Sequence, residues 1–235
     1  MDRAASFAKA LRRLAELSSV RYDRRGYGRS IGAGVAEGAS GHVDDLLAVV
    51  TSTQNLACPV VVVGHSFGGV LALAAADRRP DLIGAVGAFE APMPWLSQWP
   101  SRTAGGSAVD AARTGGPEEA AEQFMRRMIG DQRWERLPAS TRHTRRAEGS
   151  ALVAELSAMR SPGLPPYDLE TLKVPVIAGH GSLSRPHHVE AAQRLARAAH
   201  TNVLVIEGAS HSAHYTHPTE FAQFVERAIA AAERG

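Results

Sequence analysis

Ser66 is the residue of this sequence with the clearest potential for chemistry. It lies in the segment GHSFGG, residues 64–69, between the apolar run PVVVV and the apolar run VLALAAA. A serine at a tight turn from a buried strand into a helix exposes its hydroxyl at the helix N-terminus, where the helix dipole favours negative charge. The spacing therefore predicts that Ser66 is a nucleophile and that the backbone N–H of Phe67 donates to an oxyanion.

A serine hydroxyl becomes a good nucleophile only when a base accepts its proton. The segment VIEGASHSAHYTHPTEF contains three histidines, His211, His214 and His217, after the last predicted strand. His211 directly follows the turn that leaves this strand, so it is expected at the same sheet edge as Ser66 and is the predicted general base. His214 and His217 are predicted to be surface or helix-capping residues. Their spacing would also suit a metal site, but the expected loop has no carboxylate, so no metal is predicted.

The elements that must position these residues alternate between strands and helices along most of the chain. Runs of β-branched residues predict buried parallel strands, and apolar residues three or four apart predict helices that cover them. The predicted strands are 18–23, 58–66, 82–89, 174–181 and 202–208, and the predicted helices are 4–17, 44–53, 68–80, 187–199 and 218–233. This order predicts an α/β fold with a mostly parallel sheet and helices on both faces.

Residues 91–166 interrupt this alternation. They contain helical patterns at 118–129 and 150–159, separated by breaks that are rich in proline and glycine. We therefore predict a core formed by residues 1–90 and 167–235, with residues 91–166 as an insertion over the C-terminal edge of the sheet.

Composition is ordinary for a folded protein. The 235 residues are 44% hydrophobic and 21% charged, with a formal net charge of +2. Cys58 is the only cysteine, so no internal disulfide can form, and its apolar surroundings predict an inert thiol.

No apolar run approaches the ~18 residues of a membrane span, and the N-terminal segment does not resemble a signal peptide, so a cytoplasmic protein without a membrane partner is predicted. The arginines between 126 and 146 are interpreted as solvated helix surface, which predicts no nucleic-acid partner.

These segments resemble the α/β-hydrolase family over nearly the whole chain. The family's D-x-R-G-x-G-x-S turn is matched by DRRGYGRS, residues 23–30, and its G-x-S-x-G turn by residues 64–68. The family's catalytic histidine, seven residues before a proline, is matched by His211. The resemblance implies a serine hydrolase that needs no metal or organic cofactor. It also identifies residues 91–166 as the lid, and the residues expected to line or cover the substrate pocket are His65, Met93, Trp95, Leu96 and Trp99.

The acid of the catalytic triad departs from the family's usual position. Most members carry an aspartate in the loop after the strand that VPVIAGHG resembles, but this loop reads GSLSR, residues 181–185. Some members carry the acid at the end of the preceding strand, where this chain has Glu90. Glu90 is therefore predicted to orient His211 and to balance its charge. The alternatives are that Glu90 solvates the strand end or pairs with an arginine of the lid, or that Asp168 or Glu170, which precede their strand, supplies the acid.

The resemblance also implies more strands at the N-terminus than this sequence contains. In the family, a His-Gly loop before the first matched helix supplies the second oxyanion donor, and that loop would fall where Met1 stands. We hypothesise that the native chain starts upstream.

The predicted reaction is hydrolysis of a small ester, lactone or related acyl compound through an acyl-enzyme on Ser66. Two alternatives remain open. The missing oxyanion loop and the missing aspartate favour a non-catalytic, hydrolase-like protein that binds a ligand. A cofactor-free haloperoxidase-type enzyme would use the same triad.

Overall fold

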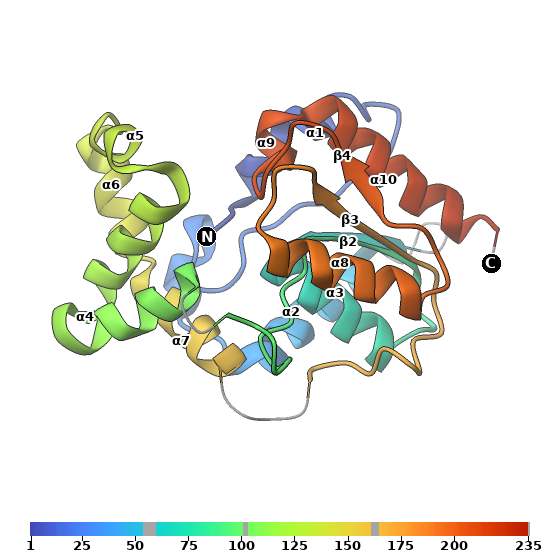
Figure 1. Ribbon diagram of the computed structural model, residues 1–235, viewed down its shortest axis with the longest axis horizontal. Helices are drawn as coiled ribbons and strands as arrows, with labels where there is room; N and C mark the ends of the chain where they lie inside the picture. Colours follow the sequence, from blue (N-terminus) through green and yellow to red (C-terminus); the bar gives the residue numbers. More distant parts are fainter. Residues whose placement is uncertain (54–59, 101–102, 161–164, 235) are drawn as a thin grey trace. The chain divides into compact units, whose positions relative to one another are not determined.

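The structure is a computed structural model that describes residues 1–53, 60–100, 103–160 and 165–234 (Figure 1). The chain forms two compact units. The sheet unit comprises Ala4–Arg21, Val43–Met93 and Pro165–Gly235, and the helical unit comprises Met1–Arg3, Tyr22–His42 and Pro94–Leu164. The role of residues 91–166 as a lid stays a prediction.

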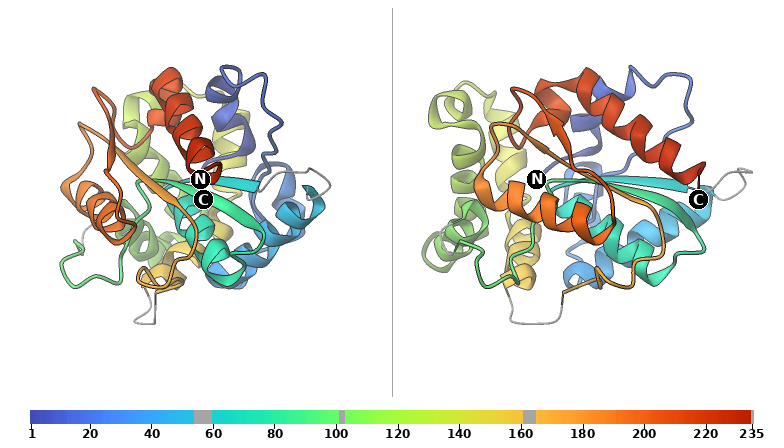
Figure 2. Two further views of the ribbon diagram at one scale, coloured as in Figure 1. Left: turned by 90° about the vertical axis from the view of Figure 1, so that its right-hand side faces the viewer. Right: turned by 45° about the vertical axis from the view of Figure 1, so that its right-hand side comes forward.

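The sheet unit contains a parallel sheet, which confirms the predicted fold class. Its strands are β1 (Val60–His65), β2 (Ile83–Phe89), β3 (Val176–Gly181) and β4 (Leu204–Ile206), in the order β1-β2-β3-β4. Helices α3 (Phe67–Arg78) and α8 (Pro186–Ala198) cover one face of the sheet, and α1 (Ala8–Leu11) and α10 (Pro218–Ala232) cover the other (Figure 2). Helices on both faces explain why the strands carry nearly continuous apolar runs.

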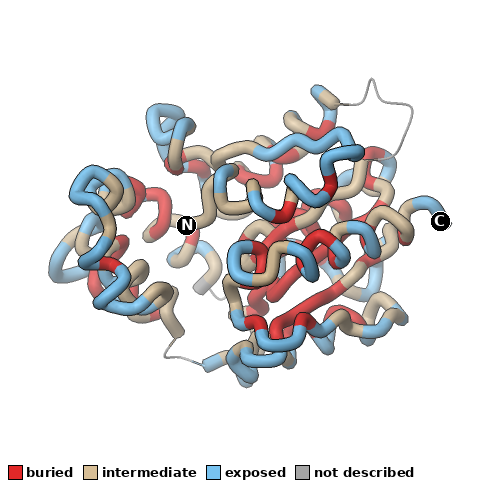
Figure 3. The backbone as a smooth tube through the Cα atoms, turned by 90° about the horizontal axis from the view of Figure 1, so that it is seen from above, coloured by how far each residue is buried: buried red, intermediate tan, exposed pale blue. Residues whose placement is uncertain are grey.

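The core of this unit forms where α10 packs on the middle strands. Phe224 of α10 lies so close to Gly87 of β2 and Gly179 of β3 that a Cβ at these positions would stand 3.2 and 2.9 Å from its ring. Phe89 and Phe221 complete the aromatic contacts, with ring centroids 5.4 Å apart. The middle strands β2 and β3 are almost entirely buried, and Figure 3 shows the buried residues in red. The two glycines therefore let α10 approach the sheet closely.

Two sequence predictions near the N-terminus are wrong in whole or in part. The predicted strand 18–23 has no β structure, and its residues up to Arg21 are exposed. A short extended segment is not stable as a strand unless it pairs with a neighbour. The predicted helix 4–17 is a 3₁₀ helix, η1 (Ala4–Phe7), followed by α1 and by turns that carry i to i+3 hydrogen bonds. Its apolar stripe still packs inward, because Ala10 and Leu14 are buried.

The remaining elements are mostly helical. Residues 28–42 contain the 3₁₀ helix η2 (Gly28–Ala33) and the start of α2 (Gly38–Thr53). The helical unit also contains α4 (Ala104–Ile129), α5 (Asp131–Glu135), α6 (Ala139–Arg146) and α7 (Gly149–Arg160). A short helix, α9 (Ala213–Thr216), lies in the sheet unit. The predicted helical patches 118–129 and 150–159 are parts of α4 and α7. None of the described helices is both long and apolar enough to cross a membrane.

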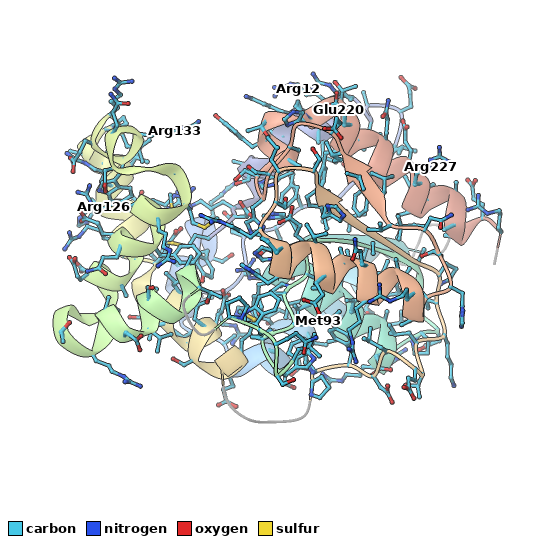
Figure 4. The ribbon with its side chains drawn as sticks, viewed as in Figure 1. Arg12, Met93, Arg126, Arg133, Glu220 and Arg227 are labelled. Atoms are coloured by element: carbon cyan, nitrogen blue, oxygen red, sulfur yellow. The ribbon has the colours of Figure 1, made fainter. Side chains whose placement is uncertain are left out.

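The arginines of the helical unit make many ion pairs with acidic residues of the same unit. Arg126, which Figure 4 labels together with Arg133, lies 2.7 Å from Glu122 and 3.2 Å from Asp131, and it also pairs with Glu135. Arg146 pairs with Glu122 as well. These pairs agree with the interpretation of this segment as solvated helix surface.

A buried carboxylate ties α7 to the segment 22–42. Glu155 is 5% exposed and accepts hydrogen bonds from the Arg24 guanidinium at 3.0 Å and the Tyr27 hydroxyl at 2.8 Å. The Nε2 of His42 lies 2.9 Å from Glu155 Oε1. Burial alone would raise the pKa of this carboxyl, but the charge of Arg24 and the hydrogen bond to His42 outweigh it, so the pKa of Glu155 is lowered.

This carboxylate makes the stability of the helical unit dependent on pH. Because the pKa of Glu155 in the folded state lies below its ordinary value of 4.5, its contribution is complete above that value and is lost as the pH falls below it. Glu155→Gln leaves the buried Arg24 without a counter-charge, so we expect a loss of about 3 kcal/mol at pH 7 and a smaller loss at pH 3. Melting temperatures measured at both pH values check this. The exposed Glu118→Gln is the control, and an equal loss at both pH values would contradict the assignment.

Candidate active site

Ser66 occupies the turn between β1 and α3. Its backbone has φ 53° and ψ −125°, a conformation that is unfavourable for a residue with a side chain. The turn is held on both sides, because the Ser66 N–H donates to the carbonyl of Phe89 at 2.9 Å and its own carbonyl accepts from Gly69 N–H at 2.8 Å. This is the strained strand-to-helix turn that exposes a serine hydroxyl at the start of a helix.

The glycines around Ser66 are required by close backbone contacts. A Cβ on Gly64 would lie 2.1 Å from the carbonyl oxygen of Gly68, and a Cβ on Gly69 would lie 2.9 Å from the Cβ of Ala91. A Cβ on Gly68 would have nothing within 4 Å. The predicted tight turn therefore depends on Gly64 for the approach of strand to helix, and on Gly69 for the approach of α3 to the end of β2.

His211 and Glu90 form an acid–base pair. The Nδ1 of His211 lies 2.6 Å from Glu90 Oε2, and Glu90 is completely buried whereas the His211 side chain is 20% exposed. A carboxylate accepts the Nδ1–H, so the neutral imidazole keeps its acceptor lone pair on Nε2. Within the described residues, no hydrogen bond joins Ser66 Oγ to this ring. Such contacts often close only when substrate binds.

Parallel pairing brings the nucleophile and the acid to the same sheet edge. His65 of β1 stands opposite Phe89 of β2, so Ser66 and Glu90 are the next residues of two adjacent strands. Glu90 also has a positive φ, of 49°. Its N–H donates to the carbonyl of Gly179 at 2.8 Å, which keeps the end of β2 attached to β3.

The loop after β3, which lacks a carboxylate, hydrogen-bonds to Glu90. Gly181 N–H donates to Glu90 Oε1 at 3.1 Å, and the Ser184 hydroxyl donates to the same oxygen. Burial would raise the pKa of Glu90, but the hydrogen bond and charge of His211 and the hydrogen bond from the Ser184 hydroxyl lower it to about 2. Glu90 is therefore ionised wherever the protein is folded near neutral pH.

Five histidine rings form a continuous column through this site. The order of the rings is His187, His188, His211, His65 and His214. The centroids of neighbouring rings lie 4.4, 4.6, 4.5 and 4.3 Å apart along this order. The His65 Nε2–H donates to the carbonyl oxygen of His211 at 2.5 Å, which fixes the backbone of the predicted base. Burial and the charge of His211 lower the pKa of His188 to about 3, so this ring is neutral.

The structure corrects one prediction and leaves others as predictions. His214 is 3% exposed, because α9 turns its ring against Phe7 and His65, so it is a core residue and not a surface residue. Met93, labelled in Figure 4, has no exposed surface, and the half-buried Trp95 belongs to the helical unit. That His65, Met93 and Trp95 line a pocket remains a prediction.

The alternative acids lie away from His211. Asp168 and Glu170 are exposed, and the Asp168 N–H contacts Asp77 near the C-terminal end of α3, opposite the end that begins after Ser66. Cys58 lies outside the described residues. Sequence reasoning missed Ser184 and His188. Ser184 stands in the loop where an acid was sought, which was a usable signal, whereas nothing in the sequence indicates that His188 contacts His211.

Comparisons with known proteins place the chain by its sequence and its fold. A family model described as "Alpha/beta hydrolase family" matches residues 2–224. An esterase from Thermogutta terrifontis has a TM-score of 0.72 at 20% identity, with 98% of this chain and 86% of that chain covered. An enol-lactonase from Burkholderia xenovorans LB400 has a TM-score of 0.72 at 21% identity, with 97% of this chain and 87% of that chain covered.

A further similar structure is an E-2-(acetamidomethylene)succinate hydrolase, with a TM-score of 0.62, 22% identity, and 97% of this chain and 88% of that chain covered. At such identities the solved structures show a shared fold and do not transfer a substrate. A search of curated protein sequences found no match.

Proposed function

Because this chain belongs to the α/β-hydrolase family, we propose that it is a serine hydrolase that cleaves a small ester, lactone or related acyl compound. Ser66 is the nucleophile, His211 the general base and acid, and Glu90 the residue that orients His211. The observation that carries the proposal is the contact of 2.6 Å between His211 Nδ1 and Glu90 Oε2, at the sheet edge where the strained turn presents Ser66.

In the acylation step, Ser66 Oγ attacks the substrate carbonyl carbon while His211 Nε2 takes the hydroxyl proton. The carbonyl oxygen becomes an oxyanion, and the Phe67 N–H at the start of α3 donates to it. When the tetrahedral intermediate collapses, the bond to the leaving alcohol breaks, and the imidazolium of His211 returns the proton to that alcohol. Glu90 stabilises the imidazolium because its charge is desolvated and lies next to Nδ1.

In the deacylation step, water takes the place of the alcohol. His211 Nε2 removes a proton from water as the oxygen attacks the acyl carbon, and the proton then passes to Ser66 Oγ as the ester bond to the enzyme breaks. The carboxylic acid leaves, and the site returns to its starting state. For a lactone the leaving alcohol and the acid are the two ends of one molecule, so the same residues complete that reaction.

Labelling with a broad serine-reactive fluorophosphonate tests the proposal. We expect one adduct, mapped by mass spectrometry to the peptide that contains Ser66, because only a serine with an activated hydroxyl displaces the leaving group at an appreciable rate. Ser66→Ala is expected to abolish the adduct and leave the melting temperature within a few degrees of that of the wild type. A folded wild-type protein that gives no adduct at Ser66 would overturn the proposal in favour of a hydrolase-like protein that binds a ligand.

A further inference from the structure

We infer that Glu90, His188 and His211 form a binding site for a transition-metal dication such as Zn²⁺, and that the bound ion inhibits the enzyme. Inhibition rests on the proposed function, whereas binding of the ion does not. The three residues come from the end of β2, from α8 and from the loop after β4, and all belong to the sheet unit.

The geometry of the three side chains suits a small dication. Each offers one ligand atom, and these atoms lie within 4.8 Å of one another. Zn²⁺ binds nitrogen and oxygen donors at about 2.0–2.2 Å in a tetrahedron, which places the donors roughly 3.3 Å apart. The contact of 2.6 Å between His211 Nδ1 and Glu90 Oε2 would open slightly, and the donor atom of His188 already lies within 4.8 Å of both.

The chemistry of the donors selects the class of metal. Two imidazoles and one carboxylate are a known ligand set for Zn²⁺, and the fourth position is left for water or another small ligand. Imidazole nitrogens also suit Cu²⁺, Ni²⁺ and Co²⁺, whereas Mg²⁺ and Ca²⁺ prefer a shell of oxygen atoms. The site should therefore discriminate strongly against the two common alkaline-earth ions.

Neighbouring residues already hold two of the three ligands, Glu90 and His211, in place. Gly181 N–H and the Ser184 hydroxyl donate to Glu90 Oε1, whereas Oε2 contacts His211 Nδ1. His65 holds the carbonyl of His211. Such second contacts orient metal ligands and commonly change metal affinity by about 10- to 100-fold. The site therefore needs little ordering when the ion binds.

Inhibition is expected because the ion replaces the proton on Nδ1 of His211, the proposed general base. The ion takes the place of the proton between His211 Nδ1 and Glu90 Oε2, and that proton moves to Nε2 of the same ring. Three metal–ligand bonds form as the ion gives up three bound waters. His211 then has the Nδ1 lone pair bound to the metal and its hydrogen on Nε2, so Nε2 cannot accept the Ser66 proton. The ion acts as an inhibitor in this proposal, and the proposed reaction itself uses no metal.

The visible absorption of Co²⁺ and the calorimetric titration of Zn²⁺ test the site without any assay of activity. For the wild-type protein we expect the intense bands of four-coordinate Co²⁺, their loss on addition of Zn²⁺, and no change with Mg²⁺. His188→Phe keeps an aromatic ring against His211 but removes one ligand, and it is expected to weaken Zn²⁺ binding by at least about 10-fold. His187→Phe, the same change at the neighbouring residue, is the matched control and should bind as the wild type does.

A second variant and a second readout keep the test decisive. Glu90→Gln removes the anionic ligand at constant size and should also weaken binding, which covers the case in which His188→Phe does not fold. If the wild type, His188→Phe and Glu90→Gln all bind Zn²⁺ with equal affinity, the proposal that these residues form the metal site is wrong. Tight Zn²⁺ binding that leaves fluorophosphonate labelling of Ser66 unchanged would overturn the inhibition. Absence of labelling in the metal-free wild type would refute the proposed function. The Co²⁺ spectrum would still show whether the metal site exists.

Discussion

Replacing Ser66 with alanine is expected to lower kcat for the hydrolysis of p-nitrophenyl acetate about 10⁶-fold, which is the scale of effect when the nucleophile of a serine triad is removed. The alanine lacks the oxygen that forms the acyl-enzyme, and a base without a nucleophile can only activate water weakly. The measurement is steady-state kinetics on wild-type and variant protein purified in the same way, with product release followed by absorbance.

The interpretation of this result depends on two controls. The strained turn persists in Ser66→Ala, since alanine also carries a Cβ, so the melting temperature should not fall. The double variant Ser66→Ala, Glu90→Gln should be no slower than Ser66→Ala alone, because the members of a triad act as one unit and their effects do not add. A residual rate above 1% of the wild-type rate would mean that another group attacks the ester.

Glu90→Gln is expected to lower kcat about 10⁴-fold while KM changes little. The amide has nearly the size of the carboxylate, but it cannot compensate the charge of the imidazolium. It can also donate its own N–H to His211 Nδ1, which would place the imidazole proton on Nε2 and remove the acceptor for the Ser66 proton. Kinetics and fluorophosphonate labelling should fall together, because both depend on removal of that proton.

Three further substitutions distinguish the role of Glu90 from a general loss of negative charge. Glu207→Gln removes an exposed carboxylate just after β4 and should leave kcat unchanged. Ser184→Ala removes one donor to Glu90 Oε1 and should lower kcat about 10-fold, since a hydrogen bond to a charged group contributes about 1.5 kcal/mol. Adding Ser184→Asp to Glu90→Gln returns a carboxylate to the loop that contacts residue 90 and should recover part of the lost rate. Loss of activity in Glu207→Gln, or full activity in Glu90→Gln, would contradict the assignment of the acid.

The position of Glu90, the proposed acid, has a simple physical basis in a parallel sheet. The carboxyl ends of β2 and β3 are neighbours, and the Glu90 N–H donates to Gly179 of β3, so either strand can deliver a carboxylate to His211. Here the carboxylate comes from the end of β2, and the loop after β3 contributes Gly181 and Ser184 as donors. The buried charge is therefore satisfied by an imidazole, a hydroxyl and a backbone amide, which makes its burial tolerable.

The sequence by itself determined the features that depend on neighbouring residues. Gly64 is needed two positions before Ser66, and the valines of β1 predict a strand without knowledge of the rest of the chain. The alternation of strands and helices then predicts a parallel sheet, and with it the common edge at which Ser66, Glu90 and His211 lie. Each of these inferences depends on contacts that are short in sequence or on the regular geometry of a sheet.

Only the tertiary structure decided which side chains touch at that edge. His211 and Glu90 are 121 positions apart, and Ser184 and Glu90 are 94 positions apart, so their contacts depend on how whole elements pack and not on local preference. For the same reason the column of histidines, with His188 against His211 and His214 in the core, was not predictable. The absence of a strand at residues 18–23 also follows from the fold, because a strand exists only where another segment offers its backbone for pairing.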